Sequence, residues 1–171
     1  MIAIDLVGTT INSGTKTYNE NFLNQLNREL LKDKVLVFVS KSYLVNEKKK
    51  LNNSVRYVVK PDMLSNSFIR LLWMQFILPF ELKYYGAKIF FSPMNYAPIL
   101  LKLTKIKSIL AIHTVLPWLY LNFLPGNLFK NFLIKKIMEL SIFFADKIIV
   151  PSNYAKQIII EKLKIQESKI K

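Results

Sequence analysis

The sequence contains no cysteine, a single histidine and only 4 glycines among its 171 residues. The lack of cysteine excludes disulfide bonds, thiolate metal sites and cysteine nucleophiles, and it fits a reducing compartment. One histidine cannot build a metal site alone, and no cluster of carboxylates accompanies it. We therefore expect no bound metal.

Acidic residues are also scarce, since 11 Asp and Glu stand against 25 Lys and Arg, which gives a net charge of +14. Such an excess favours anionic partners, such as acidic lipid or phosphorylated ligands. The alternative is a Lys-rich composition with solvated lysines on every face. Apart from Lys48-Lys49-Lys50 the lysines are scattered, and no arginine-rich stripe is present. We therefore expect no nucleic-acid partner.

Long hydrophobic runs are interrupted. Residues 109–129 carry no formal charge over about the length of a membrane-spanning helix. However, Pro117, Pro125 and Gly126 would break the backbone hydrogen bonding that lipid demands. We interpret this run as a buried strand followed by an apolar, aromatic loop. The start of the chain does not resemble a secretory signal, because Asp5 interrupts the first apolar run and no basic segment precedes it.

Short apolar runs without strict alternation predict strands that are buried on both faces. They cover residues 1–7, 34–40, 55–60, 87–92, 107–113 and 146–152. Helical patterns lie between several of them, over residues 17–32, 65–85, 127–145 and 153–164. Alternating strands and helices imply parallel crossovers. We therefore expect an α/β fold: a Rossmann-like, doubly wound, mostly parallel sheet of about six strands with helices on both faces.

Three of the helical patterns carry further expectations. The first places apolar side chains on one stripe, and Pro79 should kink or break the second. The third repeats apolar residues at helical spacing. The residues of the first stripe are Phe22, Leu23, Leu26, Leu30 and Leu31, and those of the third pattern are Phe129, Phe132, Leu133, Ile137, Leu140 and Phe144.

In doubly wound sheets, ligands bind beyond the carboxyl ends of the strands. After the first strand, "GTTINSGTKTYNENFL" contains Gly14, which can adopt a positive φ and let a ligand approach the backbone. The N–H groups of the helix that follows attract a phosphate. An ordinary strand-to-helix loop is the alternative interpretation.

Three further loops follow predicted strands. In "FFSPMNYAP" the amide of Asn95 can hydrogen-bond a sugar or a phosphate, or it can stabilise a turn. His113 ends its strand in "AIHT", either as a catalyst or as a packed structural residue. Ser152 in "VPSNYAK" is a good N-cap, and that structural role is the default for it.

The order and spacing of these four loops match a known set of motifs. "SGTKTYNENFL" keeps Gly14, Tyr18 and the asparagine–apolar step of a G-G-x-G-x-Y loop, but departs from it at Ser13 and Lys16. "FSPMN" matches S-P-x-N, and "AIHT" matches I-H-D except at Thr114. "ADKIIVPSNYAK" matches A-D-x-I-I-x-x-S-x-Y/F-x-K closely. The chain therefore resembles the N-terminal half of the two-domain (GT-B) retaining glycosyltransferases of family four, the group 1 type, which use nucleotide sugars.

The resemblance implies a domain organisation. Residues 1–165 would form a Rossmann-like acceptor-side domain, and residues 166–171 would begin an interdomain linker. In the family a second Rossmann domain follows and holds the nucleotide sugar. We therefore expect the chain to be a fragment, a truncated gene product or one half of a split enzyme, with a second-domain polypeptide as a partner.

The resemblance also implies an activity: transfer of a sugar, of the hexosyltransferase type, from a nucleotide sugar to a glycan or lipid-linked acceptor, with retention. The nucleotide sugar is a substrate, and no cofactor is expected. His113 would be catalytic and contact the sugar. Gly14 and Thr15 would approach the donor diphosphate, and Tyr18, Asn95 and Ser152 would bind the acceptor or the sugar. The isolated chain would be inactive.

Many members of the family act on lipid-linked or envelope glycans at the cytoplasmic membrane face. The aromatic-rich segments 68–85 and 116–126 can lie at such an anionic surface, which would make the protein cytoplasmic and peripheral at the inner face of the plasma membrane. The alternative is that these segments are core and second-domain contact surface.

Two other functions stay open: a non-catalytic binding or scaffold module derived from such an enzyme, and a different Rossmann-like domain, such as a nucleotide-binding or methyltransferase fold.

Overall fold

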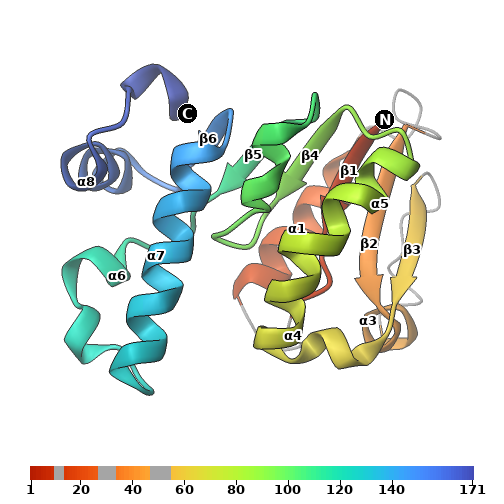
Figure 1. Ribbon diagram of the computed structural model, residues 1–171, viewed down its shortest axis with the longest axis horizontal. Helices are drawn as coiled ribbons and strands as arrows, with labels where there is room; N and C mark the ends of the chain where they lie inside the picture. Colours follow the sequence, from red (N-terminus) through yellow and green to blue (C-terminus); the bar gives the residue numbers. More distant parts are fainter. Residues whose placement is uncertain (10–13, 27–33, 47–54) are drawn as a thin grey trace.

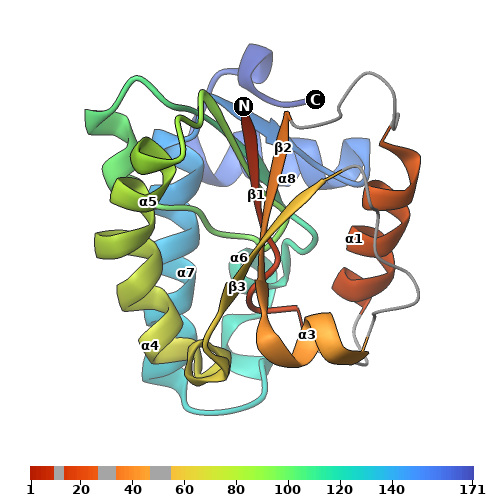
Figure 2. The same ribbon diagram turned by 90° about the vertical axis from the view of Figure 1, so that its right-hand side faces the viewer.

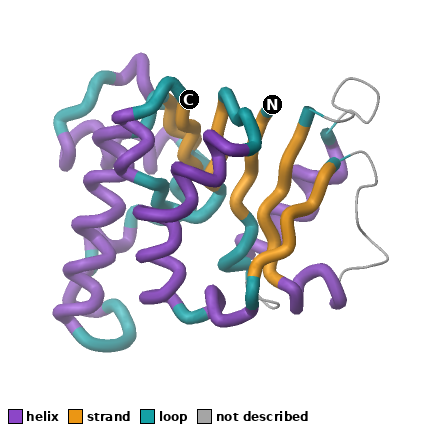
Figure 3. Tube along the Cα trace, turned by 45° about the vertical axis from the view of Figure 1, so that its right-hand side comes forward, coloured by secondary structure: helices purple, strands orange, loops and turns teal. Residues whose placement is uncertain are grey.

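The computed structural model describes residues 1–9, 14–26, 34–46 and 55–171, and Figure 1 shows its arrangement. One sheet contains six strands, every pairing is parallel, and the strand order is β3-β2-β1-β4-β5-β6. The strands are β1 Ile2–Asp5, β2 Val35–Ser40, β3 Arg56–Lys60, β4 Ile89–Ser92, β5 Lys107–Ala111 and β6 Lys147–Ile149. Each lies within one of the six predicted runs, so the predicted doubly wound parallel sheet is confirmed (Figure 3).

Helices cover both faces of the sheet, with α4, α5 and α7 on one face and α1 on the other (Figure 2). The helices are α1 Gly14–Gln25, α3 Lys41–Asn46, α4 Ser67–Leu72, α5 Leu78–Tyr84, α6 Leu116–Leu119, α7 Leu128–Phe144 and α8 Asn153–Leu163. A π-helix, Trp73–Ile77, joins α4 to α5, and short 3₁₀ turns cover Asp62–Ser65, Ile99–Leu103, Leu121–Phe123 and Glu167–Lys169.

Strand β2 shows why the sheet is buried on both sides. All six of its residues are buried. Leu36 and Phe38 belong to the apolar core under α4, α5 and α7, whereas Val35, Val37 and Val39 belong to the core under α1. Successive side chains of a strand point to opposite faces, so a run of apolar residues supplies both cores at once.

Pro79 does not end its helix. The chain runs from α4 through the π-helix into α5, and the N–H of Leu78 donates to the carbonyl of Trp73, five residues back. Proline has no N–H and its ring crowds the carbonyl four residues before it, which is the carbonyl of Gln75. The wider π turn lets the helix continue, so the sequence pattern predicted the position of the irregularity but not its form.

Residues 109–129 form the end of β5, then α6 and a 3₁₀ turn, before α7 begins at Leu128. The predicted strand is present, but the segment after it is partly helical rather than a loop. No helix in the described ranges has the length and apolar character needed to cross a membrane.

The apolar pattern of α7 is not a core stripe. Phe129, Phe132, Leu133 and Leu140 are exposed, and the buried residues of this helix are Met138, Ser141 and Ile142. In α1, Leu23 is buried, whereas Leu30 and Leu31 of the same predicted stripe lie outside the described residues.

The segment 166–171, expected to begin a linker, packs on the edge of the sheet. Ile170 is buried and pairs with Ile148 of β6 in a parallel bridge. The N–H of Lys171 donates to the carbonyl of Ile148, and the N–H of Val150 donates to the carbonyl of Lys171. These residues therefore extend the sheet beyond β6.

Candidate functional site

The strand order places one crevice at the centre of the sheet. From β1 the chain moves outward to β2 and β3, then returns to β4 on the other side of β1. Such a reversal opens a crevice at the carboxyl ends of the two central strands, where ligands of open α/β sheets bind. The loops that follow β1 and β4 border this crevice, and the end of β5 lies beside them.

His113 is fixed at this edge by three contacts. Its backbone N–H donates to Asn95 Oδ1 over 2.6 Å, its ring Nε2 lies 2.8 Å from the carbonyl oxygen of Pro93, and its ring meets Tyr18 edge to face at 4.7 Å. A carbonyl oxygen only accepts, so Nε2 carries a hydrogen. In the neutral ring Nδ1 is therefore an acceptor, and within the described ranges it has no hydrogen-bond partner. The half-buried ring can accept a hydrogen bond from a sugar hydroxyl.

Asn95 is a structural link between two loops. It adopts φ of 64°, a left-handed conformation that asparagine tolerates better than most residues. Its N–H donates to the carbonyl of Ala111 over 3.1 Å, while its side-chain oxygen accepts from His113. The side-chain oxygen of Asn95 therefore stabilises the turn, which was one of the two interpretations of the sequence. A contact between its side-chain nitrogen and a sugar stays a prediction.

Helix α1 brings Tyr18 to the same place. Tyr18 contacts His113 and also stacks on Phe22 at a centroid distance of 6.4 Å. Partial burial raises the pKa of the Tyr18 hydroxyl. Tyr18 is therefore a neutral hydrogen-bonding group at neutral pH. The structure brings Tyr18, Asn95 and His113 together, although Tyr18 and His113 are 95 residues apart in the sequence.

Gly14 and Thr15 form the first turn of α1, one turn before Tyr18. The φ of Gly14 is not positive, and an added Cβ there would meet nothing within 4 Å. Gly14 therefore does not use the positive φ that glycine permits. The N–H groups of the first helical turn lack intrahelical acceptors and favour an anion, so the donor-diphosphate role of Gly14 and Thr15 stays a prediction.

Ser152 lies apart from this group. Its Oγ accepts from the N–H of Ala155 over 3.2 Å and caps α8, the structural role that was the default for it. No contact joins Ser152 to Tyr18, Asn95 or His113 among the described residues.

A buried ion pair at the end of β1 was not predicted. Arg70 Nη2 donates to Asp5 Oδ2 over 3.0 Å, and the exposed fractions of the two side chains are 4% and 0%. Asp5 Oδ1 also accepts from the N–H of Val7 over 2.9 Å. Burial alone would lower the pKa of Arg70, but the Asp5 carboxylate and the Tyr96 hydroxyl outweigh it and raise the pKa, so the guanidinium is charged.

Arg70 also organises the β4 loop. Its Nη1 donates to the Tyr96 hydroxyl over 2.9 Å, and its guanidinium lies 5.3 Å from the centre of the Tyr96 ring. Since the Tyr96 oxygen accepts this bond, its own hydrogen is free to donate elsewhere. Gly8 packs directly against the guanidinium of Arg70. A Cβ added at Gly8 would lie only 2.0 Å from Arg70 Nη1.

Asn19 is a further residue that the sequence reasoning missed. It is 1% exposed on α1, and its Nδ2 donates to Thr9 Oγ1 over 3.0 Å and lies 4.0 Å from Met94 Sδ. These contacts connect α1 to the loops after β1 and β4. Its Oδ1 is buried and has no hydrogen-bond partner in the part of the chain that the structure describes.

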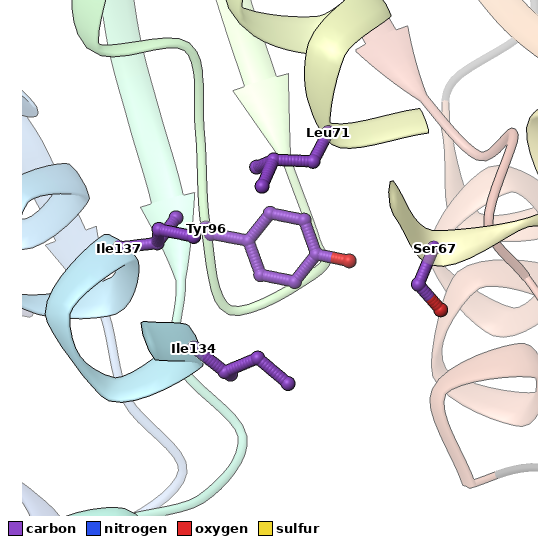
Figure 4. Close-up of a pocket in the computed structure, with 5 residues that line it drawn as sticks. All are labelled: Ser67, Leu71, Tyr96, Ile134 and Ile137. Carbon is purple, nitrogen blue, oxygen red and sulfur yellow. The ribbon is translucent and has the colours of Figure 1, made fainter. Parts of the chain in front are cut away.

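Two cavities adjoin these residues. One of about 290 Å³ is lined by Asn95, Tyr96 and Thr114 together with residues of α6 and α7. A smaller one, of about 100 Å³, lies between α4 and α7, where Tyr96 directs its hydroxyl toward Ser67 (Figure 4). Tyr96 and Ile134 line both. The walls are mainly apolar with a few polar groups, which is the usual character of a small-molecule site. In the four described ranges, no three His, Asp or Glu side chains are grouped as metal ligands.

Comparisons with known proteins show which family and which fold the chain matches. The family model of Glycosyltransferase Family 4 matches residues 12–171. Among solved structures, the chain is similar to the apo form of lipopolysaccharide outer core galactosyltransferase WaaB, with a TM-score of 0.58 and 15% sequence identity. The match covers 99% of this chain and 44% of that chain, so this chain spans less than half of the solved structure. A search of curated proteins finds no match. The chain belongs to Glycosyltransferase Family 4, and its fold is the Rossmann-like N-terminal domain of a GT-B glycosyltransferase.

Proposed function

We propose that this domain holds the acceptor in an enzyme that transfers a sugar, a hexose, from a nucleotide sugar to a glycan or lipid-linked acceptor, with retention of configuration. The observation that carries the proposal is the fixed ring of His113, whose Nδ1 has no partner among the described residues and can accept a hydrogen bond. Two neighbours of His113 line the cavity of about 290 Å³: Asn95, which accepts from its backbone N–H, and Thr114, the next residue in the chain.

On this proposal His113 contacts the transferred sugar, while Tyr18 supports the ring from the side of α1. Because the ring is held before the substrate arrives, little reorganisation is needed at the moment of reaction. Thr114 stands where the family motif has an aspartate. A threonine hydroxyl can donate or accept a hydrogen bond but brings no negative charge.

The leaving group is a nucleoside diphosphate whose negative charge must be stabilised. The first turn of α1, with Gly14 and Thr15, supplies N–H groups and the positive end of the helix dipole. The remaining stabilisation would come from a second-domain polypeptide. The acceptor then occupies the cavities between α4, α6 and α7, where Tyr96 can donate a hydrogen bond.

Ligand binding to purified residues 1–171 tests this division of roles. Saturation-transfer NMR with a panel of glycans, a lipid-linked sugar and nucleotide sugars should show binding of at least one acceptor. Tyr18→Ala and His113→Ala should weaken that binding, whereas the exposed Tyr154→Ala on α8 serves as the matched control. Tight binding of a nucleotide sugar with no binding of any acceptor would contradict the acceptor-side role.

A non-catalytic binding or scaffold module is the second candidate, favoured by the replacement of the motif aspartate by Thr114. It predicts the same acceptor binding but no transfer when a second-domain polypeptide is supplied. For the catalytic enzyme we propose a cytoplasmic location, which the absence of cysteine supports.

A further inference from the structure

Tyr96 belongs to the wall that the two cavities of the candidate functional site share. Together with Ile134 it lines both the cavity of about 290 Å³ and the smaller one of about 100 Å³. The larger cavity is also lined by Asn95 and Thr114, the two neighbours of His113. A sugar ring bound in the larger cavity can therefore direct one of its substituents past Tyr96 into the smaller cavity.

Arg70 fixes the hydroxyl of Tyr96 in one orientation. Its Nη1 donates to the Tyr96 oxygen over 2.9 Å, and Arg70 is itself held by the buried ion pair with Asp5. The hydrogen of the Tyr96 hydroxyl therefore points away from Arg70, and among the described residues it has no acceptor. Since a hydroxyl whose oxygen accepts a hydrogen bond becomes a stronger donor, the smaller cavity has one strong donor that is oriented before a ligand arrives.

The charge around this donor is balanced. The positive charge of Arg70 is paired with Asp5 over 3.0 Å, and in the described part of the chain no Lys, Arg, Asp or Glu lines either cavity. A phosphate or carboxylate bound here would lose its water without meeting an unpaired cation, which is costly. The acceptor that suits the Tyr96 hydroxyl is therefore a neutral oxygen.

The rest of the smaller cavity is mainly aliphatic. Leu71, Ile134 and Ile137 line it, and Leu71 and Ile134 lie on opposite sides of the Tyr96 ring (Figure 4). Such walls stabilise a buried methyl group. A volume of about 100 Å³ corresponds to about three water molecules at about 30 Å³ each. The cavity therefore suits a group of a few heavy atoms that combines a carbonyl oxygen with a methyl group.

We propose that the smaller cavity binds the acetamido group of an N-acetylated amino sugar in the acceptor. Its carbonyl oxygen accepts from the Tyr96 hydroxyl, and its methyl group packs against Leu71 and Ile137. The hydroxyl of Ser67, the second polar group of the cavity, can accept from the amide N–H. A sugar hydroxyl in the same place would also accept from Tyr96, but it would leave the aliphatic walls without an apolar partner.

In this arrangement Tyr96 determines specificity, and Arg70 is a positioning residue that acts through it. The inference rests on the proposed function, because it takes the sugar ring in the larger cavity to be the acceptor.

Titrations by saturation-transfer NMR with purified residues 1–171 test the inference. The probes are two pairs of methyl glycosides: N-acetylglucosamine with glucose, and N-acetylgalactosamine with galactose. Each pair differs only in an acetamido group against a hydroxyl. The N-acetyl member should bind about 10-fold more tightly, because it gains one hydrogen bond and one buried methyl group. Its acetamido methyl protons should receive the strongest saturation.

Two variants locate the acetamido group. Tyr96→Phe removes only the hydroxyl and should reduce the preference for the N-acetyl sugars to about 3-fold or less, with little effect on glucose. The exposed Tyr154→Phe on α8 is its control. Leu71→Phe should fill the smaller cavity and abolish the preference. Leu72→Phe is the matched control, since this neighbouring residue is exposed and lines neither cavity. Circular dichroism checks that each variant is folded.

The outcomes separate this inference from the proposed function. Equal affinity within each pair would overturn the inference, and so would a preference that Tyr96→Phe and Leu71→Phe leave intact. Tighter binding of glucose 6-phosphate than of N-acetylglucosamine, lost in Tyr96→Phe, would show that the cavity takes an anion and would also overturn it. In each of these cases the domain still binds an acceptor. Binding of no sugar, glycan or lipid-linked acceptor by residues 1–171 would overturn the acceptor-side role as well.

Discussion

At the scale of single residues, the edge of the sheet depends on side chains that hold one another in place. Asn95 fixes the backbone of His113, and the carbonyl of Pro93 fixes its ring. Arg70 joins Asp5 at the end of β1 to Tyr96 after β4. Two such sets of contacts, on adjacent loops, make the crevice a preorganised surface rather than a pair of independent turns.

His113→Ala should reduce turnover far more than stability in an active enzyme that contains this domain. A sugar contact that strengthens in the transition state is worth on the order of 100-fold in rate, or about 2.7 kcal/mol. Turnover and melting temperature should be measured on the same preparation. A packed structural histidine would instead lower the melting temperature and leave the rate per folded molecule intact, and that result would refute the catalytic role.

Gly8→Ala should destabilise the domain, because the new Cβ would overlap Arg70 and the guanidinium is held by Asp5 and Tyr96. Overpacking of this kind costs about 1–3 kcal/mol. Gly14→Ala is the matched control, since a Cβ there meets nothing and alanine favours the helix. Urea unfolding should show a lower midpoint for Gly8→Ala alone. Equal midpoints for the two variants would mean that the contact between Gly8 and Arg70 relaxes without cost.

The contact between Asp5 and Arg70 could not be predicted from sequence position, because 65 residues separate the partners. A signal is nevertheless present. Asp5 interrupts the apolar run of β1, and Arg70 interrupts the apolar run of α4. A charge in an apolar segment is costly to bury without a partner, so two opposite charges in two such segments favour a pair. The positions of Tyr18, Asn95 and His113 at the carboxyl edge of the sheet were predictable, because each lies in a motif at the end of a strand or the start of a helix.

At the scale of elements, the most specific motif of the sequence has a structural explanation in Asp146. Its Oδ2 accepts from the N–H of Ser108 over 2.8 Å, and its Oδ1 accepts from Lys107 Nζ over 2.9 Å. The N–H of Asp146 donates back to the carbonyl of Ser108 over 3.0 Å. Asp146 thus sets the start of β6 against β5, and Ser152 starts α8 by capping it.

Asp146→Asn should lower stability at neutral pH, with a loss that disappears in acid. Partial burial alone would raise the pKa of Asp146, but the hydrogen bonds from Ser108 and Lys107 outweigh it and lower the pKa. A carboxyl group with a lowered pKa in the folded state stabilises the fold above its unfolded pKa of about 4, and this contribution is lost as the pH falls through the folded pKa. Because the side chain is 37% exposed, the loss at neutral pH should stay below about 1 kcal/mol.

Urea unfolding of the parent and Asp146→Asn at about pH 7 and about pH 3 measures this difference. Lys107→Gln is the control, because it keeps the two hydrogen bonds from Ser108 and should cost less at neutral pH. A stability gap that is the same at both pH values would show that the carboxylate charge is not the cause.

Helix α7 shows that a sequence pattern can predict the ends of a helix without predicting its buried face. Its helical spacing predicted the element to within one residue at each end, from 127–145 against Leu128–Phe144. The spacing did not reveal which face is buried, because apolar residues surround most of the helix. Met138 and Ile142 pack on the sheet, whereas Phe129 and Phe132 are exposed. The face is chosen by tertiary packing, which local periodicity does not contain.

At the scale of the whole molecule, the two edges of the sheet carry different chemistry. The carboxyl edge contains His113, Tyr18 and the ion pair of Arg70 with Asp5. The amino edge has a cleft of about 470 Å³ near the end of α5, lined by Lys83, Lys88 and Lys105. The helical segment from α4 to α5 runs between these two edges (Figure 1). The length of this segment therefore separates the cleft from the candidate functional site.

The isolated residues 1–171 should show no sugar transfer. Charge develops on the leaving diphosphate in the transition state, and its stabilisation requires several preorganised donors in a site from which water is excluded. This domain offers the first turn of α1, where Gly14 is exposed, and a half-buried His113. Electrostatic stabilisation in such a solvent-exposed place is weak because water screens it. On the proposed function this surface holds the acceptor, but it does not by itself stabilise a departing diphosphate.

The measurement is release of nucleoside diphosphate from a panel of nucleotide sugars, with and without acceptor. Purified residues 1–171 should give the rate of the buffer, and the same protein with an associating second-domain polypeptide should exceed it. His113→Ala in the reconstituted pair is the control that links any activity to this domain. Turnover by residues 1–171 alone would show that the carboxyl edge of the sheet stabilises the leaving group by itself, and the proposed division between acceptor and donor domains would have to be abandoned.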